Sequence, residues 1–469
     1  MTITFKDVVK LAKGAHSMPA LRSVVFDGKS AMTAAQLDWM VGVPCVQAAL
    51  TTPVVVPVDA IQAHLLKSRH LVVMPDHLTN GQGLVTPFNP GKVDYSEVLH
   101  MLPKPPEGEA VSFDLELDSL DRVLIASGVH DIRYYLNGVL FDLSDGMLVG
   151  CDGHRMHTYK NRVPRPYKRK VVDGVPMGEL VEVVLPRDPL KWIVGSADVA
   201  AKVTIWNAKR PKVDGQAVVP QALLQTKDGF VWVRKAIEGK FPDWRRVLPA
   251  VVSRPVWATV NPAKLADTVA AMGKVVKLES EGKWGGVTVD FGRGQVYGRN
   301  QDQVMPLVFG LNSDRVELDV TTLSEELWMG VCATYLEDVA DCVTAEAQWR
   351  LDHTNCKNQG LLVTDGDFSG VVMGLRGYEP ERAPKVAQDA PEAQEVAPVP
   401  QIEPETAQDA LEDPETAPAE PCPAAVDAMA AQLVGQLVKS AQDAAKKAPK
   451  KARKPAKVAQ VPQAEPVDA

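Results

Sequence analysis

The sequence has few cysteines, and their positions exclude the common uses of that residue. The chain of 469 residues has six, at positions 45, 151, 332, 342, 356 and 422. No two of them form a Cys-x-x-Cys pair, which argues against a zinc ribbon and against a disulfide framework. This usage is typical of proteins kept in a reducing compartment, so we expect a cytoplasmic location.

Long apolar runs are also missing. No stretch approaches the roughly 18–20 residues that span a bilayer, so we expect no membrane segment. The N-terminal stretch MTITFKDVVKLAKG lacks the pattern of a signal peptide. Apolar residues make up 45% of the chain and charged residues 23%, which is ordinary for a globular protein. The length fits roughly three domains of about 150 residues.

Motifs of catalysis and of metal binding are absent as well. The sequence has no phosphate-binding loop of the Walker type, no His-x-x-x-His and no Gly-x-Ser-x-Gly. The run Asp152-Gly153-His154-Arg155 admits a catalytic reading, with His154 as base and Asp152 orienting it. A nucleophile or a second carboxylate at a suitable spacing is missing, however. We therefore interpret this run as a tight turn that serves binding, and we expect no catalytic residue, metal or cofactor.

Three segments of the chain share one hairpin pattern. They lie near Val24, Val139 and Val287. Each consists of an alternating strand, a turn with Asp or Gly, a second strand and a polar turn that contains Asp. An apolar run that leads into a helix follows each of them. Chance similarity between short alternating strands is the alternative explanation.

A helical pattern also precedes each hairpin. The apolar faces of these helices are Phe5, Val8, Val9 and Ala12; Leu120, Val123 and Leu124; and Leu265, Val269 and Met272. We expect Asp118 or Ser119 to cap the second helix. Asn261 should cap the third, with Pro262 at its first position.

The repeated order of helices and strands predicts an α+β fold. Each of three repeated domains should have two helices packed on an antiparallel sheet, over residues 1–112, 113–250 and 251–377. Such an array leaves sheet edges at both ends, and exposed edges are usually paired or covered. A two-fold dimer could close them by joining the first domain of one chain to the third domain of the other.

Residues 378–469 have a different composition. The stretch up to Cys422 is rich in Pro, Ala, Glu and Gln, and we expect a disordered acidic linker. A short amphipathic helix and a basic run, KKAPKKARKPAK, should follow. That run is either a solvated tail or a weak, salt-sensitive nucleic-acid contact.

Several motifs together resemble one known family. The stretches DIRYYLNGVLF, CDGHRM and GKFPDWRRVLP, in this order, resemble the beta sliding clamp of bacterial DNA polymerase III, as do ATYLEDVADCV and VVMGLR. The resemblance covers about residues 1–377 and is most specific over 120–250. It implies three DNA-clamp domains per chain and a homodimeric ring that encircles duplex DNA without reading its sequence.

The resemblance also implies a partner-peptide pocket and no catalytic activity. Such a processivity factor holds the replicative polymerase, and meets the clamp loader, through short peptides with an apolar end. The matching positions here are Arg133, Leu136, Cys151, Gly153, His154, Arg155, Pro242, Arg246, Val247, Met373, Gly374, Leu375 and Arg376. The family usually has Thr at position 151 and Pro at position 374, and its chains end near position 376.

A basic segment gives the candidate DNA contacts, because Lys and Arg bind phosphates without reading sequence. These residues are Lys160, Arg162, Arg165, Lys168, Arg169 and Lys170. A solvated loop is the alternative for this segment. Two other functions stay open for the whole chain. One is an interaction scaffold of the clamp fold that does not close a ring, and the other is a metal-dependent DNA-processing enzyme.

Overall fold

The computed structural model describes residues 3–14, 18–47, 50–89, 93–172, 175–213, 216–254, 256–279, 285–291, 294–298, 304–306, 309–313, 327–351 and 360–375. The chain divides into two units, residues 1–385 and 386–469. Four of the predictions lie outside the described residues: the linker, the helix and the basic run of residues 378–469, and the pocket residue Arg376.

The first predicted helix forms where the apolar pattern places it. It spans Phe5–Lys13 and buries Val8, Val9 and Ala12. The backbone N–H of Thr4 donates to the carboxylate of Asp7 at 3.0 Å, which fixes the first turn. The elements of this part are α1 (Phe5–Lys13), η1 (Pro19–Leu21), β1 (Ser23–Phe26), β2 (Ser30–Gln36), β3 (Trp39–Pro44), β4 (Val54–Pro57), α2 (Val58–Leu65), β5 (Val72–Val73), β6 (His77–Thr79), β7 (Val85–Pro87) and α3 (Ser96–His100).

The second part begins its helix earlier than predicted. Glu116 stands at the cap position, so the expected cap at Asp118 or Ser119 is wrong. Strand β8 runs directly into the helix, and the buried hydroxyl of Ser119 donates back to Glu116 at 3.2 Å. The elements are β8 (Ala110–Glu116), α4 (Leu117–Leu124), η3 (Tyr134–Leu136), β9 (Gly138–Asp142), β10 (Met147–Cys151), β11 (Arg155–Lys160), β12 (Lys170–Val172), β13 (Val175–Met177), β14 (Glu182–Pro186), α5 (Arg187–Val194), β15 (Ala200–Trp206), β16 (Lys212–Val213), β17 (Gln216–Ala217), β18 (Gln221–Gln225), β19 (Phe230–Val233) and η4 (Trp244–Arg246).

The third part confirms the predicted helix start. The backbone N–H of Lys264 donates to the side-chain oxygen of Asn261 at 3.1 Å, and Pro262 is the first residue of the helix. The elements are η5 (Val251–Ser253), β20 (Val256–Val260), α6 (Pro262–Glu279), β21 (Gly286–Asp290), β22 (Gln295–Tyr297), β23 (Val304–Pro306), β24 (Phe309–Ser313), β25 (Trp328–Cys332), α8 (Ala333–Asp341), β26 (Gln348–Arg350), β27 (Leu361–Asp365) and β28 (Phe368–Val372).

Two long antiparallel sheets each combine strands from different parts of the chain. One has the order β4-β1-β2-β3-β19-β18-β15-β8, and the other β14-β9-β10-β11-β28-β27-β26-β20-β24. In the first sheet the join is β3 with β19, where Val41 lies opposite Val231. In the second it is β11 with β28, where Met156 lies opposite Val371. A third sheet has the order β23-β22-β21-β25. The α+β class is confirmed, whereas the three domain boundaries stay a prediction.

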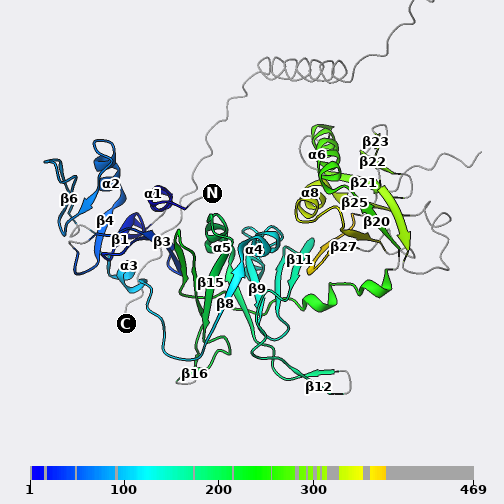
Figure 1. The fold of residues 1–469 in the computed structure, drawn as a ribbon, viewed down its shortest axis with the longest axis horizontal. Helices are drawn as coiled ribbons and strands as arrows, with labels where there is room; N and C mark the ends of the chain where they lie inside the picture. The colour runs from blue at the N-terminus through cyan, green and yellow to red at the C-terminus, as the bar shows by residue number, and fades with distance from the viewer. Residues whose placement is uncertain are drawn as a thin grey trace, which may run out of the picture. The chain divides into compact units, whose positions relative to one another are not determined.

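The second sheet has a helix face and an opposite face. Successive side chains of a strand point to opposite sides. Val139 and Phe141 of β9 therefore join the core cluster that contains residues of α4 and α5. Leu140, between them, packs instead with Trp244 of η4. Figure 1 draws α4 and α5 on one side of the strands β9 and β11. Because the two faces are covered by different segments, they can serve different functions.

Candidate partner-binding pocket and basic surface

A pocket of about 270 Å³ lies on the face opposite the helices, where β11 meets β28. It gathers eight of the predicted pocket residues: Arg133, Leu136, Cys151, Gly153, Arg155, Pro242, Val247 and Met373. Three further lining residues, Tyr135, Met156 and Val371, were not predicted. Met156 could have been identified from the sequence, because the alternation of side chains along β11 places it on the face opposite His157. The sequence holds no local signal that Val371 would lie beside Met156.

The floor of the pocket is apolar and well packed. Leu136 and Met156 are each 1% exposed, and Val371 is 2% exposed. All three belong to one core cluster with Phe241 and Trp244. At the rim, Val247 is 41% and Met373 is 43% exposed. A buried floor with exposed apolar side chains at the rim suits a partner that inserts one or two apolar groups.

The alternation of the RYYLNG segment predicts a strand, and this prediction is wrong, because Leu136 lies in a 3-10 turn, Tyr134–Leu136. The backbone N–H of Leu136 donates to the carbonyl of Arg133 at 2.8 Å, and that of Asn137 donates to Tyr134 at 3.0 Å. The Asn137 side chain also bonds the backbone of Asp131, at 2.8 and 2.9 Å. These local bonds replace the ladder of a strand and turn Leu136 into the floor.

The tight turn predicted at Asp152 is confirmed. A side-chain oxygen of Asp152 accepts the backbone N–H groups of His154 and Arg155, each at 2.9 Å. Gly153 has φ +88°, and a Cβ there would lie 2.5 Å from the guanidinium of Arg133. The positive φ therefore favours glycine here, and a larger residue would displace the guanidinium of Arg133. The turn presents Cys151 and Arg155 to the pocket.

Arg133 is fixed at the rim by two acceptors. Its guanidinium donates to the Asp131 carboxylate at 2.7 Å and to the carbonyl of Asp152 at 2.9 Å. Hydrogen bonds from Arg133 lower the pKa of Asp131 to about 2. The Arg133 side chain remains 43% exposed. A positive charge is therefore held in one place while it stays accessible to an anionic group on a partner.

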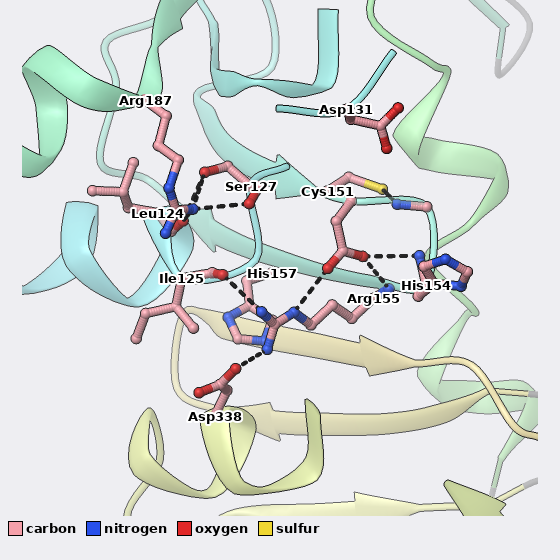
Figure 2. Close-up of polar contacts among 12 residues, drawn as sticks. Leu124, Ile125, Ser127, Asp131, Cys151, His154, Arg155, His157, Arg187 and Asp338 are labelled. Atoms are coloured by element: carbon pink, nitrogen blue, oxygen red, sulfur yellow. Dashed lines mark hydrogen bonds and ion pairs between the residues drawn. The ribbon is translucent and has the colours of Figure 1, made fainter. Parts of the chain in front are cut away.

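Arg155 links the pocket to α8. Its guanidinium pairs with Asp338 of α8 and with Asp152 at 3.2 Å, and it donates to the carbonyl of Ile125 at 3.0 Å. It also lies 4.6 Å from the ring centroid of Tyr335. Figure 2 shows this guanidinium between Ile125 and Asp338. The side chain is 10% exposed, so these contacts are shielded from water. Burial and pairing make Arg155 an organiser of the pocket wall.

Four of the predicted pocket residues lie beside the pocket and do not line it. The exposed His154 stacks on Tyr335 with 6.0 Å between ring centroids. Arg246 lines a neighbouring hollow with Tyr135 and Pro242. The backbone N–H of Leu375, which follows Gly374, donates to the carbonyl of Gly330 at 2.7 Å. The residue after Leu375, Arg376, is outside the described residues.

The chemistry available at the pocket is that of binding. Burial raises the pKa of the Cys151 thiol, which disfavours the thiolate needed of a nucleophile. Within the described ranges, no group of three or more His, Cys, Asp or Glu side chains is placed to hold a metal ion. A larger and more polar cavity of about 480 Å³ lies elsewhere, beside Asp38, His130, Arg187 and Lys235. It contains none of the predicted site residues.

The six predicted DNA-contact residues differ in their surroundings. Arg162 pairs with Glu116 at 3.3 Å and Arg169 pairs with Asp145 at 2.9 Å. Lys160, Arg165, Lys168 and Lys170 are exposed. Lys160 shares its side of β11 with Met156, so it points to the pocket face. Whether any of the six contacts DNA stays a prediction.

Among the described helices, none is long and apolar enough to cross a membrane.

No protein-family model matches the chain. Curated relatives do match it. The beta sliding clamp of Vibrio cholerae is 24% identical over 263 residues, which cover 55% of this chain and 58% of the relative. The beta sliding clamp of Pseudomonas putida is 27% identical over 263 residues, covering 55% and 62%. The chain thus matches about three-fifths of the length of these relatives.

Solved structures match a larger share of the chain. The DNA polymerase III subunit beta of Pseudomonas aeruginosa has a TM-score of 0.55 and 18% identity, covering 79% of this chain and 97% of that one. The beta sliding clamp of C. crescentus has a TM-score of 0.55 and 18% identity, covering 79% and 96%. At this identity the match establishes the fold. In sequence and in fold, the chain therefore resembles the bacterial beta sliding clamp, the beta subunit of DNA polymerase III.

Proposed function

We propose that the protein is a processivity factor without catalytic activity: a ring that encloses duplex DNA and holds a replicative polymerase by a short peptide. The observation that carries the proposal is the pocket itself. Residues from four separate motifs, which resemble a clamp's partner site, converge on one apolar cavity. Apolar side chains of the peptide would enter between Leu136 and Val247, and an anionic group would meet Arg133. The expected location of such a protein is the cytoplasm.

Two opposite faces support simultaneous binding of DNA and a partner. The pocket lies on the face away from α4 and α5, so a partner bound there leaves the helix face free for the duplex. Sequence-independent contact with phosphates calls for Lys and Arg side chains. Exposed side chains of this kind, which no motif in the sequence marks, occur on α1 and α6. They are Lys6, Lys10, Lys13, Lys264, Lys274 and Lys277.

Ring closure is supported by strands at the ends of sheets. The strands that join one repeat to the next are β3 with β19 and β11 with β28. By position in its repeat, β23 corresponds to β3 and β11, and β7 corresponds to β19 and β28. Among the described residues β23 pairs with β22 alone and β7 with β6 alone. A second copy of the chain could therefore pair β7 with β23, and two such joins close a dimer.

The pocket is tested by fluorescence anisotropy with a labelled peptide that ends in two apolar residues after a glutamine. Val247→Asp and Met373→Asp should each weaken binding at least about tenfold, or about 1.4 kcal/mol, because a carboxylate would replace an exposed apolar rim. Val199→Asp, at a position that is 81% exposed and outside the pocket, is the matched control. Unchanged affinity in both rim variants would refute the pocket.

Ring closure is tested by sedimentation velocity at micromolar concentration. The wild-type chain should sediment as a dimer. Val304→Lys in β23 and Val85→Lys in β7 should raise the monomer fraction, because both positions are exposed in the single chain, at 45% and 53%. Val199→Lys serves as the control. A wild-type monomer would instead favour a clamp-fold scaffold that does not close a ring, the alternative left open by the sequence.

A further inference from the structure

Two strand hairpins extend from the second part of the chain, away from its helices. They are β12–β13 and β16–β17. Figure 1 draws both at the side remote from α4 and α5, with β12 and β16 lying apart. The described segments that lead into them, residues 160–170 and 206–212, contain no Asp or Glu and carry nine Lys or Arg residues. These two entry segments therefore present a positive surface at the base of the hairpins, named here the hairpin surface.

Contacts at the base of the hairpins join the two entry segments, although the hairpins themselves lie apart. The ammonium group of Lys209 lies 4.3 Å from the ring centroid of Tyr167 and 3.3 Å from a carboxylate oxygen of Glu109. Tyr167 and Ala208 also pack in the same core cluster. The arrangement of the two basic segments is thus set by the fold and does not depend on a ligand.

Several of the positive charges have no protein partner among the described residues. Lys160, Lys168, Lys170 and Lys212 are exposed, and no ion pair or side-chain hydrogen bond within the described ranges involves them. Arg162 and Arg169, by contrast, are paired with Glu116 and Asp145. The four lysines are therefore available to an external anion, while the paired arginines shape the base of the surface.

From this placement we propose that the hairpin surface binds the phosphate backbone of a nucleic acid outside the ring. A single phosphate would satisfy one hairpin alone, whereas an extended polyanion reaches both. The proposal differs from enclosure of a duplex, because it needs neither ring closure nor the peptide pocket. It rests on the proposed function only in that DNA is the polyanion that such a protein would meet.

The test is anisotropy of a labelled 30-nucleotide DNA with the full chain, as single strand and as blunt duplex, between 50 and 200 mM salt. Linear DNA of this length is bound by direct contact and cannot retain a ring. In the hairpin variant, Lys160, Lys168, Lys170 and Lys212 are all changed to Gln. Its control changes Lys29, Lys67, Lys202 and Lys227, which are also exposed, to Gln. The basic run of residues 446–457 is present in all three proteins, so any contribution it makes to DNA affinity is the same in each.

Four phosphate contacts give a salt slope steeper by about 3 for a single strand and by about 4 for a duplex. Over this fourfold change in salt, the wild-type chain should lose about 50-fold to about 150-fold more affinity than the hairpin variant loses. The control variant should follow the wild type. The surface prefers the form of DNA for which the hairpin variant loses the larger share of the wild-type affinity at 200 mM salt.

Equal salt slopes in the wild-type and hairpin variant would overturn the proposal. So would a polyglutamate peptide of matched charge that competes as well as DNA, because the surface would then fit an acidic protein. The hairpin variant should still bind the pocket peptide and dimerise as the wild type does. If the wild-type chain neither bound the pocket peptide nor dimerised, the proposed clamp function would be refuted. The hairpin surface would still be judged by the salt slopes alone.

Discussion

The ion pair between Arg155 and Asp338 should be one of the stronger side-chain contacts of the structure. It joins residues 183 positions apart in the sequence, and the two side chains are 10% and 29% exposed. Removing one partner of a buried pair costs about 3–5 kcal/mol. Asp338 is partly exposed, and Arg155 keeps Asp152 and the Ile125 carbonyl. We therefore expect Asp338→Ala to lower the free energy of unfolding by about 1.5–3 kcal/mol.

A double-mutant cycle isolates the pair from the other contacts of Arg155. Arg155→Ala, Asp338→Ala and the double variant are unfolded in urea, and the coupling free energy is taken from the three differences. A coupling of about 1–3 kcal/mol is expected. The matched control is the pair Arg22 and Asp59, which also joins distant elements but whose side chains are 44% and 75% exposed. Its coupling should be about 0–1 kcal/mol. A coupling below about 0.5 kcal/mol for Arg155 and Asp338 would refute the reasoning.

Three further predictions concern the turn, one buried histidine and the C-terminal residues. Gly153→Ala should weaken binding of the pocket peptide at least about tenfold, as measured by anisotropy, and should destabilise the fold by about 1 kcal/mol. The reason is that φ is positive at this position and that Arg133 occupies the space of a Cβ. An affinity equal to that of the wild type would contradict this prediction. Burial lowers the pKa of His157 to about 4, so the unfolded chain binds the proton more readily. Stability in urea should therefore fall as pH drops from about 6.5 towards 4, and His157→Gln should flatten that dependence; equal slopes would argue against it. Deleting residues 379–469 should leave the dimer intact in sedimentation, and a monomer would show that those residues close it.

Local sequence patterns predicted the helices and the turn well. Asn261 followed by Pro262 predicted the start of α6, because the cap and the missing proline N–H are local effects. The Asp152 turn was predictable for the same reason, since its hydrogen bonds reach only two and three residues along the chain. Eight pocket residues were found through the resemblance of motifs, which carries information that a single local pattern lacks.

Contacts between distant segments were not predictable from local patterns. The pairing of Met156 with Val371 joins strands from different repeats, and nothing near either residue specifies the other. The RYYLNG segment alternates like a strand, but bonds between Asn137 and Asp131 fold it into a 3-10 turn. The cap of α4 was placed too late because Glu116 ends a strand and begins the helix in one step.

The pairing of β11 with β28 has a consequence for the order of events during synthesis. Met156 and Val371 meet in the floor of the pocket, so the floor is complete only when β28 has docked. A ribosome would have made more than two-thirds of this chain before that strand exists. A growing chain therefore lacks a finished peptide site, even after its first two repeats have folded. In the proposed function, a chain that stops before β28 would therefore not bind the partner peptide, because part of the pocket floor would be missing.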